Sequence, residues 1–162
     1  MSERIDAYAH IGLPRFATAE QLLSVLDRHG VARAVVAAAD TCPDLGEVSR
    51  AAAAYPERLR AVGVPLGDTD GEIRASLELQ ARAGFLGIRV FDRMLAARPG
   101  LLDLIGDLGL VPYVVGGPAL EPAARLLADF LAADDGRLVV APHFGGVAAP
   151  DLLEAAGPVN EL

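Results

Sequence analysis

The sequence predicts an α/β fold in which parallel strands alternate with helices, arranged as an incomplete (β/α) barrel of about six units. Six apolar, strand-like runs recur along the 162 residues. Their starts lie roughly 26 residues apart, and such an even spacing indicates a repeated unit. The stretches between the runs carry helix signals, and no hairpin signal joins two runs, so the strands are expected to be parallel.

The expected strands are rich in Val, Ala and Leu, as is typical of strands covered on both faces. In chain order they are IDAYAHIG, VARAVVAAA, LRAVGVPL, FLGIRVF, LVPYVVG and RLVVAPHF, which begin near Arg4, Val31, Leu59, Phe85, Leu110 and Arg137.

The expected helices are marked by their ends. Two of them open with a capping-box pattern and end before a glycine: Thr18 and Gln21 before Gly30, and Thr69 and Glu72 before Gly84. Further helices are expected at Asp44–Ala54, at Leu101–Ile105 after Pro99, and along a stripe that Gly136 closes, formed by Leu120, Ala124, Leu127 and Leu131.

Two architectures fit this order of elements: a TIM-barrel-like fold and an open doubly wound sheet. A doubly wound sheet usually has a G-x-G-x-x-G turn after its first strand, and HIGLPRF lacks one, so the barrel is favoured. We expect one domain over residues 1–162. Eight units would need roughly 210 residues, so six strands leave the edges of the first and the sixth uncovered. A second copy of the chain, or a separate subunit that completes the barrel, is expected to cover them.

Composition and charge exclude several classes of protein. The hydrophobic fraction of 52% is enough for a core, and the net charge of −8 opposes binding to nucleic acid or anionic lipid. No apolar run reaches the ~20 residues of a membrane helix, and MSERIDAYAH shows no secretory signal. We therefore expect a cytoplasmic protein that acts on a small molecule.

All 14 basic residues are arginine, which excludes some chemistry. Without lysine there is no Schiff-base lysine, no P-loop lysine and no carbamylated lysine bridging two metals. The single cysteine, Cys42, cannot form a disulfide within the chain or a thiolate metal site by itself.

The candidate site lies where the strands end, because loops converge there in barrels of this type. Strand alternation places Asp6, Tyr8 and His10 on one face of the first strand. The sixth strand ends in APHFGG, which brings His143 to the same rim. His10 and His143 are expected to be catalytic, the alternative being structural, hydrogen-bonded histidines. Tyr8 is either a hydrogen-bond donor in the site or a core residue.

Two charged residues are candidates for substrate binding. Arg89, inside GIRVFD, either grips a substrate carboxylate or neutralises Asp92 or Asp40. Asp40 ends the second strand and is either a site residue or a helix N-cap. By contrast, His29 is expected at a helix C-terminus, where a cation suits the helix dipole and has a structural role.

The runs IDAYAHIG, LDRHGVARAVV, YPERLRAVGVP, GFLGIRV and VVAPHFGG, in this order, resemble the amidohydrolase superfamily in its amidohydrolase-2 branch. The likeness extends over essentially the whole chain and over the first three-quarters of a typical member. It implies a (β/α)8 barrel, here C-terminally short, and membership among metal-dependent hydrolases, lactonases and decarboxylases of small carboxylated or aromatic substrates.

The metal ligands that the resemblance implies are degenerate in this chain. The family's His-x-His on the first strand is here Tyr8 and His10, and its histidine on the fifth strand is replaced within Val115–Gly117. The histidine on the sixth strand corresponds to His143, and the acid on the eighth strand has no counterpart. Two imidazoles are fewer than the three protein ligands of a catalytic zinc.

Three functions remain open at this point. The first is a hydrolase of a lactone, ester or amide, or a related decarboxylase, that uses His10 and His143 either as ligands of a divalent metal such as zinc or as acid–base groups without a metal. Tyr8 then donates to the developing oxyanion and Arg89 orients a carboxylate. The second is a degenerate relative that binds a ligand or stabilises a subunit. The third is an open α/β ligand-binding domain.

Overall fold

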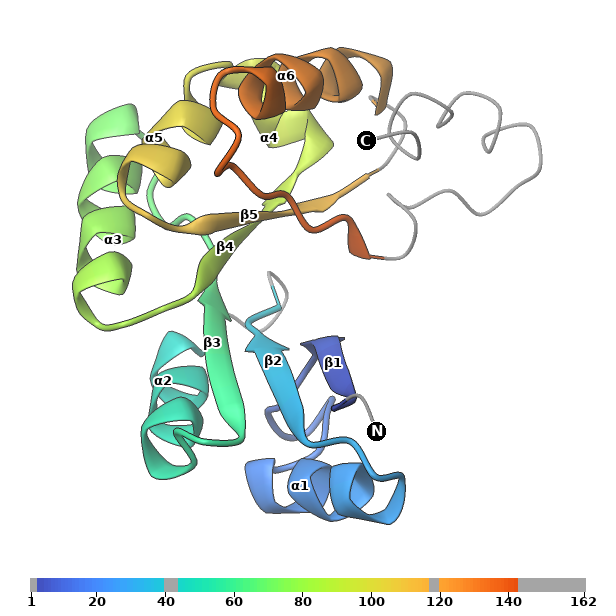
Figure 1. The fold of residues 1–162 in the computed structure, drawn as a ribbon. Helices are drawn as coiled ribbons and strands as arrows, with labels where there is room; N and C mark the ends of the chain where they lie inside the picture. The colour runs from blue at the N-terminus through green and yellow to red at the C-terminus, as the bar shows by residue number, and fades with distance from the viewer. Residues whose placement is uncertain (1–2, 40–43, 117–119, 143–162) are drawn as a thin grey trace. The chain divides into compact units, whose positions relative to one another are not determined.

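The computed structural model describes residues 3–39, 44–116 and 120–142 (Figure 1). By its contacts the chain divides into two units, Met1–Leu86 and Gly87–Leu162. The expectation of a single domain over 1–162 stays a prediction. Among the described residues, no helix is long and apolar enough to span a bilayer.

The first unit alternates strands and helices. Its elements are β1 (Ile5–Ala9), α1 (Ala19–Arg28), β2 (Arg33–Ala37), α2 (Leu45–Ala54), β3 (Leu59–Gly63) and α3 (Asp70–Arg82). β2 pairs in parallel with β1 on one side and with β3 on the other. Beyond its first residue β2 is buried throughout, as expected for a central strand of a parallel sheet. Helix α2 packs along β3.

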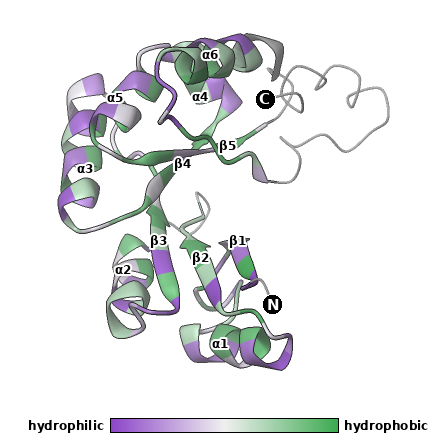
Figure 2. Ribbon diagram, in the orientation of Figure 1, coloured by the Kyte–Doolittle hydropathy of each residue, from purple (hydrophilic) through white to green (hydrophobic). Residues whose placement is uncertain are grey.

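The sequence signals for the helix ends are confirmed. Thr18 caps α1 and Thr69 caps α3, each with a complete capping box. The glycines expected after these helices, Gly30 and Gly84, have φ of 62° and 80°, the left-handed conformation that a C′ residue needs. His29 is the C-cap of α1, at the helix C-terminus where the sequence placed it. The ribbons of α1 and α3 alternate between hydrophobic and hydrophilic residues, as surface helices do (Figure 2).

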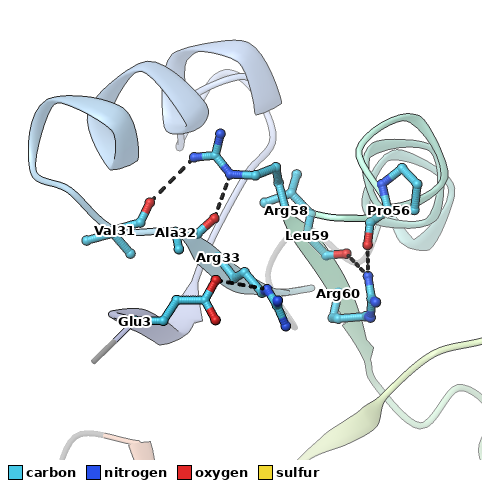
Figure 3. Close-up of polar contacts among 8 residues, drawn as sticks. All are labelled: Glu3, Val31, Ala32, Arg33, Pro56, Arg58, Leu59 and Arg60. Carbon is cyan, nitrogen blue, oxygen red and sulfur yellow. Dashed lines mark hydrogen bonds and ion pairs between the residues drawn. The ribbon is translucent and has the colours of Figure 1, made fainter. Parts of the chain in front are cut away.

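Arg58 joins the N-terminal ends of β2 and β3 in the first unit (Figure 3). Its Nε donates to the carbonyl of Ala32 at 2.6 Å, and Nη2 donates to the carbonyl of Val31 at 3.4 Å. The same Nη2 forms an ion pair of 2.7 Å with Asp27 of α1. The guanidinium of Arg58 therefore connects the segment before β3 with the segment before β2 and with helix α1.

The described residues of the second unit form two strands and three helices. They are β4 (Gly87–Phe91), α4 (Asp92–Ala97), α5 (Leu101–Asp107), β5 (Val111–Val115) and α6 (Leu120–Ala132). β4 and β5 pair in parallel without a register shift. Ile88 and Val90 are fully buried on one face, whereas Arg89 and Phe91 alternate with them and are half-buried. All three helices lie on one side of this strand pair (Figure 1).

Two predicted elements of the second unit differ from the structure. The sixth run forms a single parallel bridge from Val140 to Tyr113 in place of a strand among the described residues. The buried stripe of α6 is Ala123, Leu127 and Phe130, one position away from the predicted stripe apart from Leu127. Helix α4 was not predicted, because its six residues are too few to show a helical period.

Candidate functional site

Strand β1 contains a bulge at Ala7 and Tyr8, just before His10. Asp6 pairs with Ala34 and Ala9 pairs with Val36, so two residues of β1 stand opposite one residue of β2. The backbone N–H of Tyr8 donates to Oδ1 of Asp6 at 3.0 Å. The bulge interrupts the strict alternation from which a shared face for Asp6, Tyr8 and His10 was expected. Bulges of this kind occur next to active sites, where they redirect a side chain.

The imidazole of His10 is anchored to the backbone of β2 through Nδ1. Nδ1 lies 2.7 Å from the carbonyl oxygen of Ala37, the last residue of β2. A carbonyl can only accept a hydrogen bond, so Nδ1 carries the proton. The neutral ring therefore has its lone pair on Nε2, the arrangement that suits either a general base or a metal ligand whose other nitrogen is held by the backbone.

Among the residues that the structure describes, the rings of Phe16 and Tyr8 contact the half-buried His10. The ring of Phe16 stacks on the imidazole with centroids 4.8 Å apart and planes inclined by 25°. The ring of Tyr8 meets it edge-on, also at 4.8 Å and with planes at 76°. The hydroxyl of Tyr8 is buried. Tyr8 and His10, two residues apart in the sequence, therefore form one aromatic cluster with Phe16.

The loop after β1 brings Phe16 back to His10. Ile11 forms a parallel bridge with Ala17, and the N–H of Gly12 donates to the carbonyl of Ala17 at 3.0 Å. The N–H of Phe16 donates to the carbonyl of Gly12 at 2.8 Å. Gly12 has φ of 121°, which a residue with a side chain rarely adopts. The guanidinium of Arg15 lies 5.3 Å from the centroid of Phe16.

In the second unit Arg89 belongs to a cluster at the end of β4. Its guanidinium lies 4.6 Å from the ring centroid of Phe91, and that of Arg93 lies 4.9 Å from the same centroid. Asp92 is buried, and its Oδ1 accepts a bond of 2.6 Å from the N–H of Arg93. Tyr113, paired with Arg89 in register, is buried, and this burial raises the pKa of its hydroxyl.

The structure brings two of the predicted site residues together, Tyr8 and His10. Arg89 belongs to the second unit, at the predicted place on β4. Asp40 and His143 lie outside the described residues. The convergence of His10 and His143 at one rim therefore stays a prediction.

Whether a metal ion fits near His10 depends on the donor side chains around it. Over residues 3–39, 44–116 and 120–142 there is no group of three His, Cys, Asp or Glu side chains that could hold a metal ion. His10 is held by a backbone carbonyl, as metal-binding histidines commonly are. Tyr8, two residues before it, has a phenol in place of the second imidazole that would complete a pair of histidine ligands. The described residues thus fit one metal ligand and not a complete site.

Sequence reasoning missed Phe16 and the carbonyl of Ala37. Phe16 had one usable signal, since an aromatic residue in the glycine- and proline-containing loop HIGLPRF is poorly placed for the core. A backbone carbonyl has no signature in the sequence. Its role depends on the neighbouring strand being in register.

Comparisons with known proteins find similarity in structure only. No family model matches the chain, and no curated protein sequence matches it. Among solved structures it resembles a probable 2-pyrone-4,6-dicarboxylic acid hydrolase from Acinetobacter baumannii with bound citric acid, with a TM-score of 0.61 and 20% identity over 89% of this chain. An uncharacterised TIM-barrel protein from Bordetella bronchiseptica has a TM-score of 0.66 and 19% identity over 88% of this chain.

A third similar structure is a 5-carboxyvanillate decarboxylase from Novosphingobium aromaticivorans with bound manganese, with a TM-score of 0.63 and 15% identity over 94% of this chain. The chain spans 59%, 56% and 69% of these three proteins, in the order given. At such identities the likeness establishes the fold alone. This chain has the parallel (β/α) fold of TIM barrels, with five strands described and the barrel incomplete.

Proposed function

We propose that this chain is the part of a hydrolase that carries His10 as a general base, acting on a lactone, ester or amide of a small carboxylated or aromatic molecule. A related decarboxylation of such a molecule belongs to the same proposal. The observation that carries it is the hydrogen bond from Nδ1 of His10 to the Ala37 carbonyl, because this bond places the proton on Nδ1 and makes Nε2 the basic nitrogen of the imidazole. The fold shared with a pyrone-dicarboxylate hydrolase and a carboxyvanillate decarboxylase supports the choice of substrate.

The hydrolytic step assigns one role to each residue. Nε2 of His10 takes a proton from water while the water oxygen bonds to the substrate carbonyl carbon and the carbonyl electron pair moves to oxygen. The hydroxyl of Tyr8 donates to that oxyanion. When the C–O or C–N bond breaks, the imidazolium returns the proton to the leaving group. His143 is proposed as the partner imidazole from the sixth run, and Asp40 as a substrate-binding residue.

A divalent metal is the alternative way to use the same imidazole. The bound manganese of the carboxyvanillate decarboxylase supports this form. His10 and His143 would be its protein ligands, with zinc as the expected ion from the sequence. The metal would act as a Lewis acid on a carbonyl.

The test measures hydrolysis of dihydrocoumarin and phenyl acetate, a simple aryl lactone and ester, with and without prior treatment with a chelator. His10→Ala should abolish turnover, and the matched control His29→Ala, at the C-cap of α1, should leave it unchanged. Turnover that survives chelation supports the acid–base form, and loss restored by Zn²⁺ or Mn²⁺ supports the metal form. Equal activity of the His10→Ala variant and the unaltered chain would contradict both.

Arg89 is proposed to bind the substrate carboxylate, and a pair of probes isolates this role. Arg89→Leu should raise KM for 4-carboxyphenyl acetate and leave KM for phenyl acetate unchanged, because only the first probe carries a carboxylate. Arg89→Lys keeps the charge and loses the planar fork, so it should recover part of the loss. An equal effect on both probes would show that Arg89 is structural.

The replacement of the family's first histidine by Tyr8 favours a second candidate, a ligand-binding relative that performs no hydrolysis. In that case aromatic carboxylates bind in calorimetry, His10→Ala weakens the binding, and no product forms. Product formation in the chain and not in the His10→Ala variant decides against this candidate.

A further inference from the structure

We propose that Phe16 is a positioning residue for His10, holding the plane of the imidazole so that the Ala37 carbonyl can keep the proton on Nδ1. The proposal rests on the proposed function for its catalytic consequence. Its structural content, a single plane and a single tautomer for His10, is tested separately.

The hydrogen bond to the Ala37 carbonyl positions Nδ1 and does not by itself define the plane of the imidazole. The side chain still turns about its Cβ–Cγ bond, a torsion with broad minima. A turn of the ring would carry Nδ1 away from the Ala37 carbonyl, 2.7 Å distant in the structure, and release the tautomer. A contact that restricts the ring plane therefore helps to keep the proton on Nδ1.

Phe16 supplies a constraint of the right kind. Its ring lies within 25° of parallel to the imidazole at 4.8 Å, so a large turn of His10 would drive one edge of the imidazole into the phenyl face. Tyr8, at 76°, bears on the same imidazole from a nearly perpendicular direction. Stacking restricts the plane of the imidazole. Within that plane the ring has two orientations related by a half-turn, and the Ala37 carbonyl selects the one that places Nδ1 against it.

The loop holds Phe16 in position independently of the core. Its backbone is closed by the bonds of Gly12 and by the bridge of Ile11 with Ala17. Arg15 approaches the phenyl ring with its guanidinium at 5.3 Å, a weak cation–π contact. Phe16 itself is half-buried, whereas Ile11, at 6% exposure, and Gly12 are buried. The phenyl ring of Phe16 therefore packs on the half-buried His10 more than in the core.

The experiment records the tautomer of His10 by long-range ¹H–¹⁵N NMR at a pH of about 8, where an ordinary imidazole is neutral. His10→Ala assigns the signals. The unaltered chain should show His10 protonated on Nδ1. Phe16→Leu removes the flat face, Phe16→Met does so with an unbranched side chain, and both should give a mixture of tautomers. Phe16→Tyr keeps the ring and should restore the single tautomer. Thermal unfolding checks that each variant is folded.

Tyr55→Leu is the matched control, since Tyr55 is a half-buried aromatic residue at the C-cap of α2. It should leave the His10 signals unchanged. In kinetics with the aryl ester, Phe16→Leu should lower kcat by roughly tenfold or more with KM within about twofold, because a misplaced base loses rate and not binding.

The outcomes separate this inference from the proposed function. If the Leu and Met variants keep one tautomer, or if the unaltered chain already shows two, the positioning role is overturned. If the chain hydrolyses nothing while the two variants still mix the tautomers, the proposed function fails and the positioning of His10 stands.

Discussion

Asp6 stabilises the bulged form of β1 through the 3.0 Å bond that its Oδ1 accepts from the N–H of Tyr8. Asp6→Ala should lower the free energy of unfolding by about 1 kcal/mol, because a backbone donor loses its acceptor. Asp6→Asn keeps an oxygen acceptor and should retain most of the stability. Urea unfolding of the three proteins measures this. If the Ala and Asn variants are equally stable, the hydrogen-bond acceptor at position 6 does not account for the contribution of Asp6.

Gly63 ends β3 with its Cα facing the buried side chain of Gln80. A Cβ at Gly63 would lie 1.6 Å from Oε1 and 2.8 Å from Cδ of Gln80. Gln80 cannot simply move, because its Nε2 donates to the carbonyl of Val64 at 2.8 Å and to Oγ of Ser76 at 3.0 Å. Gly63→Ala should therefore cost roughly 2–3 kcal/mol through overpacking and broken hydrogen bonds.

A double-mutant cycle checks this explanation for Gly63. In a chain that already carries Gln80→Ala, Gly63→Ala should cost much less than by itself, since the clashing amide is gone. Gly71→Ala is the control, because nothing lies within 4 Å of a Cβ at this position of α3 and helix propensity favours alanine. If the two substitutions at 63 and 80 are additive, the amide is not the obstacle.

At the scale of elements, the helix ends were the most predictable feature. The capping boxes of Thr18 and Thr69 depend on side chains three residues apart, so the sequence contains all of the information. Strand pairing depends on distant segments, and the sixth run shows the consequence. Its apolar pattern predicted a strand, yet only Val140 pairs with β5 among the described residues. An apolar run indicates that a segment is buried, but it does not determine how many of its residues pair with a neighbouring strand.

The same distinction applies to the candidate site. The spacing of Tyr8 and His10 predicted that they lie together, and their rings are in contact. The bulge of β1 arises from a register shift, and the carbonyl of Ala37 belongs to a neighbouring strand. The stacking of Phe16 on His10 depends on the closed loop after β1. These features require the folded chain. The sequence thus indicated the candidate residue, His10, and not the contacts that orient it.

The N-terminal turn of α3 makes stability depend on pH through Glu72. The N–H of Thr69, then the Thr69 hydroxyl and the N–H of Asp68, donate to this carboxylate and lower its pKa from 4.5. The folded state therefore favours the charged form. Its contribution to stability is present above pH 4.5 and is lost as the pH falls through the lower pKa of the folded state.

Glu72→Gln should remove this dependence, because the amide does not ionise in that range. In urea titrations from pH 7 to pH 3, the stability difference between the unaltered chain and the variant should shrink below pH 4.5. Glu57→Gln, at an exposed glutamate in the turn before β3, serves as the control for the loss of one carboxylate. A difference that stays constant down to pH 3 would contradict the assignment of the cap.

At the scale of the whole molecule, strand β1 presents an edge. Within the described residues of the first unit, β2 is its one strand partner. Ile5 on β1 is 56% exposed, and Ala7 is also exposed. An exposed edge with apolar side chains is a site where another strand adds. This supports the proposal, made from the sequence, that a second copy or a separate subunit covers an edge of the incomplete barrel.

We expect the purified chain to associate with itself, and its charge makes the association dependent on salt. Each copy carries −8, so two copies repel at low ionic strength, and screening at higher salt should raise the average mass above the 16.8 kDa of one chain. Light scattering over a range of concentrations at two salt levels measures this.

Ile5→Lys adds a charge to the edge of β1 and should reduce the average mass at high salt, because charged edge residues oppose the addition of another strand. Leu79→Lys is the matched control, because Leu79 is 63% exposed on α3 and lies on no strand. A constant mass of one chain at every concentration and salt level would refute self-association, and an equal effect of the two lysine variants would assign it to exposed apolar surface in general and not to the edge of β1.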